Sequence, residues 1–238
     1  REYLNGLQWD GSPRIDTWLS TYGAAPDTEL VRAIGHIVLV AAVRRVRTPG
    51  CKFDELLILE NEQELEKSTA LRSLCPNPQW FSDDLSLGAS SKEVVEGTGG
   101  KWIIEASELI GNKREAERLK GFLSRQVDGP VRLAYGHYAT EVPRQFVLIG
   151  TTNKHAYLKD ATGNRRFWAV RVERFKVEAL RRDRDQLWAE AAMREAKGES
   201  IRLDAALWHA AEQEQKRREV IDPWEERLLP QFEKGRPY

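Results

Sequence analysis

Short runs of apolar residues alternate along the chain with segments in which apolar residues recur at helical spacing. The runs are bounded by glycine, proline or charged residues, as buried strands usually are. They predict strands over 53–60, 80–81, 102–105, 146–150 and 166–172. Helical periodicity between them predicts helices over 68–74, 91–96 and 113–126. This alternation predicts an α/β fold in which helices cover both faces of a mostly parallel sheet.

The two ends of the chain have helical patterns without strands. Ser12-Pro13 is typical of a helix N-terminus, and Asp27 is expected to cap a longer helix that runs to about Val46. Beyond Glu178, alanine, glutamate and arginine dominate, and helices are expected over 186–196, 204–218 and 223–232. The chain is therefore divided into an N-terminal helical segment (1–48), an α/β core (49–176) and a helical C-terminal appendage (177–238).

Composition narrows the class of protein. The 238 residues carry 37 basic and 37 acidic side chains, and 41% are hydrophobic, which is a globular composition. Two cysteines and four scattered histidines form no metal-ligand pattern and suit a reducing compartment, so a cytoplasmic location is expected. No apolar run is long enough to span a membrane. Zero net charge argues against a protein that coats nucleic acid, but it leaves room for a local basic groove.

The chain starts at Arg1, and its one methionine is Met193. We therefore expect it to be part of a longer protein, with part of the function outside this sequence.

A first candidate for chemistry lies between the expected strand 53–60 and the expected helix 68–74. The segment 61–69 ends in Lys67-Ser68-Thr69, and a strand, a loop and Lys-Ser at a helix start are the context of a phosphate-binding loop. Such a loop needs glycines that permit positive φ and let backbone N–H groups approach the phosphates. Asn61 and Glu66 occupy the two glycine positions, so an acidic strand-to-helix turn is the alternative interpretation.

Three further polar signals follow at strand ends. Glu105 ends a buried strand, with Glu108 one helical turn on, where a magnesium-holding carboxylate lies in doubly wound sheets. Asn153 follows another buried strand and is placed to orient water or sense a γ-phosphate. Arg165 and Arg166 begin the last strand and suit an arginine finger. Taken singly, each signal has an equally plain alternative. Glu105 would cap the next helix, Asn153 would be an ordinary turn residue, and Arg165 and Arg166 would be surface charge.

In the order of these signals and in several short motifs, the chain resembles the virulence-associated E proteins. The matching stretches cover residues 1 to about 172 and are specific as a set: 7–11 (LQWDG), 49–52 (PGCK), Gln63, Lys67-Ser68-Thr69, 102–109 (WIIEASEL), 120–124 (KGFLS), Asp128, Arg132, Tyr135-Gly136, 143–145 (PRQ), 150–153 (GTTN) and 160–168 (DATGNRRFW).

The resemblance implies a fold and a function. These proteins are encoded by phages, plasmids and pathogenicity islands and are similar to superfamily 3 helicases, so the α/β core is expected to be a P-loop NTPase of the AAA+ class. Members are thought to couple ATP hydrolysis to movement of DNA during replication of mobile elements. A homo-oligomeric ring and single-stranded or fork DNA are the implied partners.

The resemblance also assigns roles to residues. Nucleotide binding falls to Gln63, Lys67, Ser68 and Thr69, and Ser68 and Glu105 hold the Mg²⁺ that accompanies ATP. Catalysis falls to Glu105, Glu108, Asn153, Arg165 and Arg166. The pattern over 131–142 predicts a β-hairpin, which in superfamily 3 helicases grips single-stranded DNA, and the implied DNA-binding residues are Lys120, Arg132, Tyr135 and His137.

One departure from the family pattern changes the expectation. The family loop is similar to Gly-x-Gln-Gly-x-Gly-Lys-Ser-Thr, and here Asn61, Glu64 and Glu66 replace all three glycines. Like charges about 4 Å apart cost about 4 kcal/mol at an effective dielectric constant near 20, so both glutamates should suppress ATP binding.

Three interpretations therefore remain open: an ATP-driven DNA motor, a hydrolysis-deficient DNA-binding or assembly module on the same fold, and an unrelated α/β regulatory domain. In the first two, Glu60, Glu105 and Asn153 should lie near one edge of the sheet.

Overall fold

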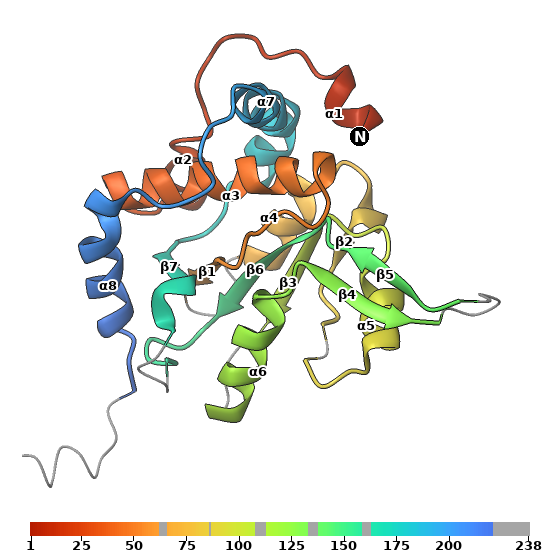
Figure 1. The fold of residues 1–238 in the computed structure, drawn as a ribbon. Helices are drawn as coiled ribbons and strands as arrows, with labels where there is room; N and C mark the ends of the chain where they lie inside the picture. The colour runs from red at the N-terminus through yellow and green to blue at the C-terminus, as the bar shows by residue number, and fades with distance from the viewer. Residues whose placement is uncertain (62–65, 86, 108–112, 133–137, 159–162, 221–238) are drawn as a thin grey trace, which may run out of the picture.

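Five parallel strands form the central sheet of the computed structural model, which describes residues 1–61, 66–85, 87–107, 113–132, 138–158 and 163–220 (Figure 1). In spatial order they are β2 (Phe81–Ser82), β3 (Ile103–Ser107), β6 (Val147–Thr152), β1 (Leu56–Glu60) and β7 (Phe167–Arg171). Each neighbouring pair is parallel. The predicted mostly parallel sheet is confirmed, with strand ends that differ by a few residues.

Alternate residues of the strands face two separate layers of helices. Leu57 and Leu59 share a core with α3 (Glu29–Arg47), α4 (Lys67–Leu74) and α7 (Val177–Ala196). Leu56 and Ile58 point to the other face, where they share a core with α5 (Ser91–Thr98) and α6 (Lys113–Leu123). β1 is buried on both faces, which is why its sequence LLILE is almost continuously apolar.

The other described elements are short. They are the helices α1 (Glu2–Gly6), α2 (Trp18–Gly23) and α8 (Trp208–Lys216), the 3₁₀ turns η1 (Pro78–Trp80), η2 (Asn164–Arg166) and η3 (Ala205–Leu207), and the antiparallel hairpin strands β4 (Val127–Val131) and β5 (Thr140–Pro143). The expected helix 204–218 is therefore a 3₁₀ turn followed by α8. The expected helix 223–232 lies outside the described residues.

The first predicted helix starts later than its sequence signal. α2 begins at Trp18 rather than after Ser12, because the amides in between have tertiary partners. The amides of Arg14 and Ile15 donate to the buried carboxylate of Glu190 on α7, at 2.5 and 3.0 Å. The prediction that Ser12-Pro13 starts the helix is therefore wrong.

The cap of α3 also differs by one residue from the prediction. The Thr28 hydroxyl accepts a hydrogen bond from the Val31 amide at 3.2 Å, so Thr28 is the N-cap. Asp27 instead forms an ion pair with Arg32 at 2.6 Å. The helix ends at Arg47, just before Thr48-Pro49-Gly50, where proline and glycine are expected to stop it.

A network of charged side chains joins α7 to the N-terminal helices. Arg194 pairs with Asp16 at 2.8 Å and with Glu190 at 2.7 Å. His36 lies 2.9 Å from Asp16 and 2.8 Å from Glu199. Hydrogen bonds from His36 and Arg194 lower the pKa of the Asp16 carboxyl from 3.8 to about 2. Charged side chains of opposite sign, of which only Glu190 is fully buried, thus link the long helix α7 to the start of the chain.

The predicted hairpin is present, and a buried ion pair anchors its base. Arg144 follows β5 and binds Asp128 of β4 with two hydrogen bonds of 2.6 Å. Its guanidinium lies 4.0 Å from the centroid of the Phe122 ring. The two strands begin at Val127 and end at Pro143, so the hairpin is longer at its base than the predicted span 131–142, and residues 133–137 lie outside the described residues.

Helix α7 contributes to the core rather than only to the surface. Trp188 is fully buried, its indole N–H donates to the Leu74 carbonyl at 2.7 Å, and its ring lies 4.2 Å from that of Trp102. The sheet, the N-terminal helices and α7 therefore share one hydrophobic core. The domain boundaries at 48 and 176 stay predictions. No described helix is both long and apolar enough to cross a membrane.

Candidate functional site

The carboxyl end of the sheet brings Lys67 and Asn153 together. Lys67 is the first residue of α4, and its ammonium group donates to the Asn61 carbonyl at 2.9 Å and to the Asn153 side-chain oxygen at 2.8 Å. Burial lowers the pKa of Lys67, and the nearby Glu105 carboxylate opposes that shift. A lysine with these partners at the start of a helix is placed to exchange them for an anion.

Next to Lys67, two hydroxyl groups converge on a buried carboxylate. The Ser68 hydroxyl donates to Glu105 Oε1 at 2.7 Å, and the Thr151 hydroxyl donates to the same oxygen at 2.6 Å. Glu105 is 1% exposed, and its second oxygen has no hydrogen-bond partner within the described part of the chain. A buried carboxylate oxygen without a partner is costly, so this atom is suited to a cation or a water.

Hard cations such as Mg²⁺ prefer oxygen ligands. The hydroxyl of Ser68 and the carboxylate of Glu105 supply oxygen ligands of that kind, and their role in holding Mg²⁺ stays a prediction. The described residues contain no group of three histidine, cysteine, aspartate or glutamate side chains that would hold a metal unaided. A divalent ion at this site would therefore need a ligand such as a phosphate to complete its coordination.

The loop before α4 ends in a left-handed residue. Glu66 has φ 59° and ψ 25°, a conformation that glycine adopts at little cost and that a residue with a side chain adopts only with strain. Its carboxylate pairs with Arg174 at 3.2 Å, and both side chains are well exposed. At the other end of the loop, the Asn61 side-chain amide donates to the Val172 carbonyl. Gln63 and Glu64 lie outside the described residues.

Glu60, which ends β1, belongs to a second buried cluster. Arg218, just beyond α8, pairs with both oxygens of the Glu60 carboxylate, at 2.6 Å for Oε2. The Tyr157 hydroxyl donates to Oε1 at 2.5 Å. Burial raises the pKa of Tyr157, and the Glu60 charge adds to that effect. Glu60 thus lies at the expected edge, but its carboxylate is committed to Arg218 and Tyr157.

Arg165 and Arg166 lie at the opposite end of the sheet. They form η2 just before β7, and in the register of the sheet Phe167 is level with Leu56, the first residue of β1. The five residues of β1 separate the two ends by roughly 13 Å, at about 3.3 Å per residue. Arg166 pairs with Asp54 at 3.2 Å, and Arg165 is exposed. Within one chain, the structure does not bring these arginines to Lys67.

The other residues assigned from the sequence are dispersed. Thr69 is exposed on α4. Lys120 on α6 is half-buried, with its ammonium group 5.7 Å from the centroid of the Phe167 ring, and Arg132 is exposed directly after β4. Gln63, Glu108, Tyr135 and His137 lie outside the described residues.

Sequence reasoning missed three residues that support the site. Thr151 was detectable, because it is a polar residue near the end of a mostly apolar strand, on the same side as Asn153. Arg174 and Arg218 carry no local signal, since their acidic partners, Glu66 and Glu60, are more than a hundred residues away.

Comparisons with known proteins agree with this fold. One similar solved structure is entitled the A form apo structure of the NrS-1 C-terminal region; it is 12% identical, with a TM-score of 0.56 over 96% of this chain and 53% of that one. A second apo structure of that region (305–718) is 13% identical, with a TM-score of 0.50 over 96% and 54% of the two chains. The chain thus spans about half the length of both, and identities this low show the fold alone.

A search of curated proteins gave no significant match. The model of the virulence-associated protein E-like domain, by contrast, matches residues 4–220, which is most of the sequence. The chain therefore belongs to the virulence-associated protein E-like domain family.

Proposed function

We propose that this chain is an ATP-dependent helicase or translocase module that acts on DNA during replication of a phage, plasmid or other mobile element. The observation that carries the proposal is the meeting of Lys67 and Ser68, at the start of α4, with Asn153 and Glu105, from two neighbouring parallel strands. Ligands of open α/β sheets bind outside the carboxyl ends of the strands, and phosphates bind at helix N-termini.

Each residue has a physical role in that proposal. Lys67 exchanges its oxygen partners for phosphate oxygens, and Asn153, then released, orients the attacking water. Ser68 and Glu105 would hold Mg²⁺, which neutralises charge on the transferred phosphate. Thr151 keeps the Glu105 carboxylate oriented by its hydrogen bond of 2.6 Å. Because Glu105 already accepts two hydrogen bonds on one oxygen, its other oxygen is left for this purpose.

The proposal also needs a second copy of the chain. Arg165 and Arg166 lie at the end of the sheet remote from Lys67, so they can complete a nucleotide site only across a subunit boundary. A ring of identical subunits satisfies this requirement, because each heterologous contact presents one end of a subunit to the other end of its neighbour. DNA would contact the hairpin β4–β5, next to the exposed Arg132.

A second candidate function has its own support. Glu66 adopts the left-handed conformation at a position where the family has glycine, and its carboxylate stands at the entrance of the loop. A hydrolysis-deficient DNA-binding or assembly module on the same fold would keep the buried contacts of Glu105 and Lys67 as structural bonds. The two functions differ in whether magnesium and ATP bind.

Calorimetric titration with magnesium and ATP separates the two functions. The unaltered chain is compared with a variant in which Asn61, Glu64 and Glu66 are all changed to glycine, and hydrolysis is followed with and without single-stranded DNA. The motor proposal expects the triple variant to bind ATP and to lose that binding on Lys67→Ala. If neither the unaltered chain nor the triple variant binds ATP, the isolated chain has no nucleotide site. DNA binding without ATP hydrolysis would favour the second function.

The arginine roles are tested in the glycine-restored background. Arg165→Ala should reduce ATP turnover without lowering the melting temperature, since Arg165 is exposed. Arg182→Ala is the matched control, because Arg182 is exposed on α7 and pairs with its neighbour Asp183. Equal turnover in the Arg165 variant and the control would remove Arg165 from the catalytic set.

A further inference from the structure

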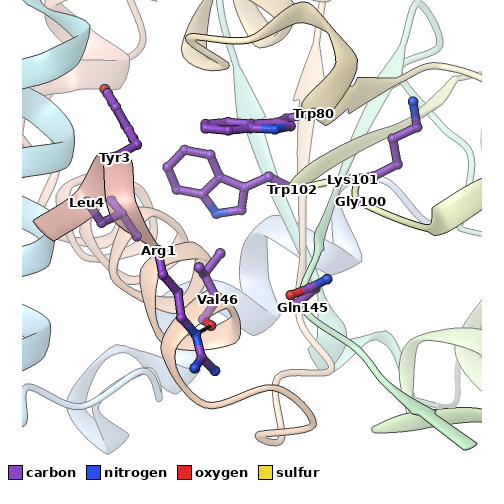
Figure 2. Close-up of a pocket in the computed structure, with 9 residues that line it drawn as sticks. All are labelled: Arg1, Tyr3, Leu4, Val46, Trp80, Gly100, Lys101, Trp102 and Gln145. Carbon is purple, nitrogen blue, oxygen red and sulfur yellow. Dashed lines mark hydrogen bonds between the residues drawn. The ribbon is translucent and has the colours of Figure 1, made fainter.

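A pocket lined by aromatic rings lies at the amino end of the sheet, away from Lys67. Trp80 directly precedes β2, Trp102 precedes β3, and Gln145 lies just before β6. The pocket has a volume of about 170 Å³. A cavity of about 150 Å³ holds one benzene ring, so this space matches a single planar ring system. Its lining residues are Arg1, Tyr3, Leu4, Val46, Trp80, Gly100, Lys101, Trp102 and Gln145 (Figure 2).

Ring packing and a hydrogen bond hold the aromatic walls of the pocket in place. The rings of Trp80 and Trp102 meet edge to face, with centroids 6.0 Å apart at 72°, and Tyr3 packs against Trp80 at 6.0 Å and 61°. Trp102 is buried, and its indole N–H donates to the Ala42 carbonyl at 2.9 Å. Such fixed aromatic surfaces stack on nucleic-acid bases, each stacked base contributing about 1–3 kcal/mol to binding.

The polar groups of the pocket favour an anionic occupant. Arg1 and Lys101 are the charged residues in its lining, and no acidic side chain joins them there. Arg1 donates to the Val46 and Arg47 carbonyls at 3.0 Å each, and Lys101 donates to the Gln79 carbonyl at 3.0 Å. These carbonyls orient the cations without neutralising them, and each cation keeps further N–H donors.

Gln145 adds a group that can recognise the edge of a base. Its side chain is exposed and makes no hydrogen bond to any described residue, so its donor and acceptor are both available. An amide of this kind pairs with base edges through two hydrogen bonds. Figure 2 shows Arg1 and Lys101 on opposite sides of the pocket, with the indole rings between them.

We infer that this pocket binds one nucleotide of single-stranded DNA. The base lies against the indole ring of Trp80, which the buried Trp102 supports edge to face, and Gln145 faces the edge of the base. Arg1 and Lys101 contact the phosphates on the two sides of that nucleotide. A strand fits better than a free nucleotide, because a strand carries a phosphate on each side of the sugar. The site shares with the proposed function only the premise of a DNA partner, and it needs neither ATP nor a ring.

The test measures binding of fluorescein-labelled oligothymidylate by anisotropy, without nucleotide or magnesium. Trp80→Ala should weaken binding about fivefold or more, as expected for loss of one stacked base. Lys101→Ala should also weaken binding and lower the slope of log affinity against log salt by about 0.7, the value for one phosphate contact on a single strand. The controls are Trp208→Ala and Lys92→Ala, which remove an exposed tryptophan on α8 and an exposed lysine on α5 and should leave affinity unchanged.

Photocrosslinking with an oligomer that carries 5-iododeoxyuridine gives an independent result. The crosslinked peptide should contain Trp80 or Tyr3, and free thymidine monophosphate at the same nucleotide concentration should not displace the oligomer. Crosslinks confined to other peptides, displacement by the free nucleotide, or unchanged affinity in the Lys101 and Trp80 variants would each overturn the inference.

Two further variants keep the test decisive. Trp80→Phe retains a stacking ring and should retain most of the affinity, so it separates loss of stacking from loss of folding. If Trp80→Ala does not fold, Lys101→Ala and Gln145→Ala decide the question. Lys67→Ala should leave oligothymidylate binding intact, so failure of this pocket can be distinguished from failure of the nucleotide site. Loss of oligothymidylate binding in the Lys67 variant would place the DNA elsewhere.

Discussion

Replacing Glu66 by glycine tests the interpretation of the loop most directly. The change removes a residue held at φ 59°, which costs about 1–2 kcal/mol for a residue with a side chain. Against this gain, glycine adds freedom to the unfolded chain worth about 0.4–1 kcal/mol. It also removes the Glu66–Arg174 pair, whose side chains are 38% and 72% exposed, and an exposed pair contributes about 0.2–1 kcal/mol.

These contributions nearly cancel. Glu66→Gly should change the free energy of unfolding by no more than about 1 kcal/mol, which is a shift of roughly 2–4 °C in melting temperature for a chain of this size. Glu66→Ala keeps the strained backbone and loses the same ion pair, so it should be less stable than the parent and no more stable than Glu66→Gly. Thermal unfolding followed by circular dichroism measures both variants.

The same change should increase affinity for ATP. A unit charge about 4 Å from a phosphate charge costs about 1 kcal/mol in water and about 4 kcal/mol at an effective dielectric constant of 20. Since Glu66 is partly exposed and faces Arg174, the lower value applies, and 1 kcal/mol corresponds to about fivefold in affinity. Titration with magnesium and ATP up to millimolar concentration, monitored by the rise in melting temperature, detects such weak binding.

Glu66→Gln is the matched control, because it removes the charge and keeps the side chain and its strain. A gain in ATP affinity in both variants assigns the effect to charge. A gain in the Glu66→Gly variant alone assigns it to the backbone. If Glu66→Gly lowers the melting temperature by more than the range above, the left-handed turn carries no strain. If neither variant gains affinity, Glu66 does not suppress nucleotide binding.

Three other predictions concern stability. Thr151→Val should cost about 1–3 kcal/mol, because the buried Glu105 loses a hydrogen-bond donor, whereas Thr151→Ser should stay near the parent in calorimetry. Arg218→Ala should cost about 3–5 kcal/mol in urea unfolding by leaving Glu60 buried and unpaired, and a Glu60→Gln, Arg218→Met double variant should cost less. The pKa of Asp16 lies near 2 in the fold and near 3.8 in its ordinary state. The stability that ionised Asp16 contributes is therefore complete above about pH 4 and is lost as the pH falls toward 2. Asp16→Asn should flatten the fall in melting temperature over that pH range.

The sequence predicted the parts of the fold that depend on local pattern. The apolar runs gave the five strands, and the alternation with helices gave the parallel sheet. The proximity of Glu105 and Asn153 also followed, because parallel strands place their carboxyl ends together. The prediction that Glu105 ends its strand is wrong, since β3 continues to Ser107. Glu105 and Asn153 thus lie beside Ser68 and Lys67 as expected, while their chemical roles stay predictions.

The parts that escaped prediction depend on contacts between distant segments. Ser12 has the sequence of a helix cap, yet the amides of Arg14 and Ile15 bond to Glu190, far along the chain. Nothing near position 66 indicates that Arg174 balances the Glu66 charge. Local patterns decide which elements form, whereas the pairing of charged groups depends on how those elements meet.

The C-terminal part of the chain helps to stabilise the candidate site, although the motifs that suggested the family end near residue 172. Arg218 holds the carboxylate of Glu60, the last residue of β1. The next residue is Asn61, whose carbonyl accepts a hydrogen bond from Lys67. A chain that stopped before α8 would leave the Glu60 charge buried without Arg218, at the point where the loop begins. The family model matches through residue 220, just past Arg218, as expected if this support is part of the domain.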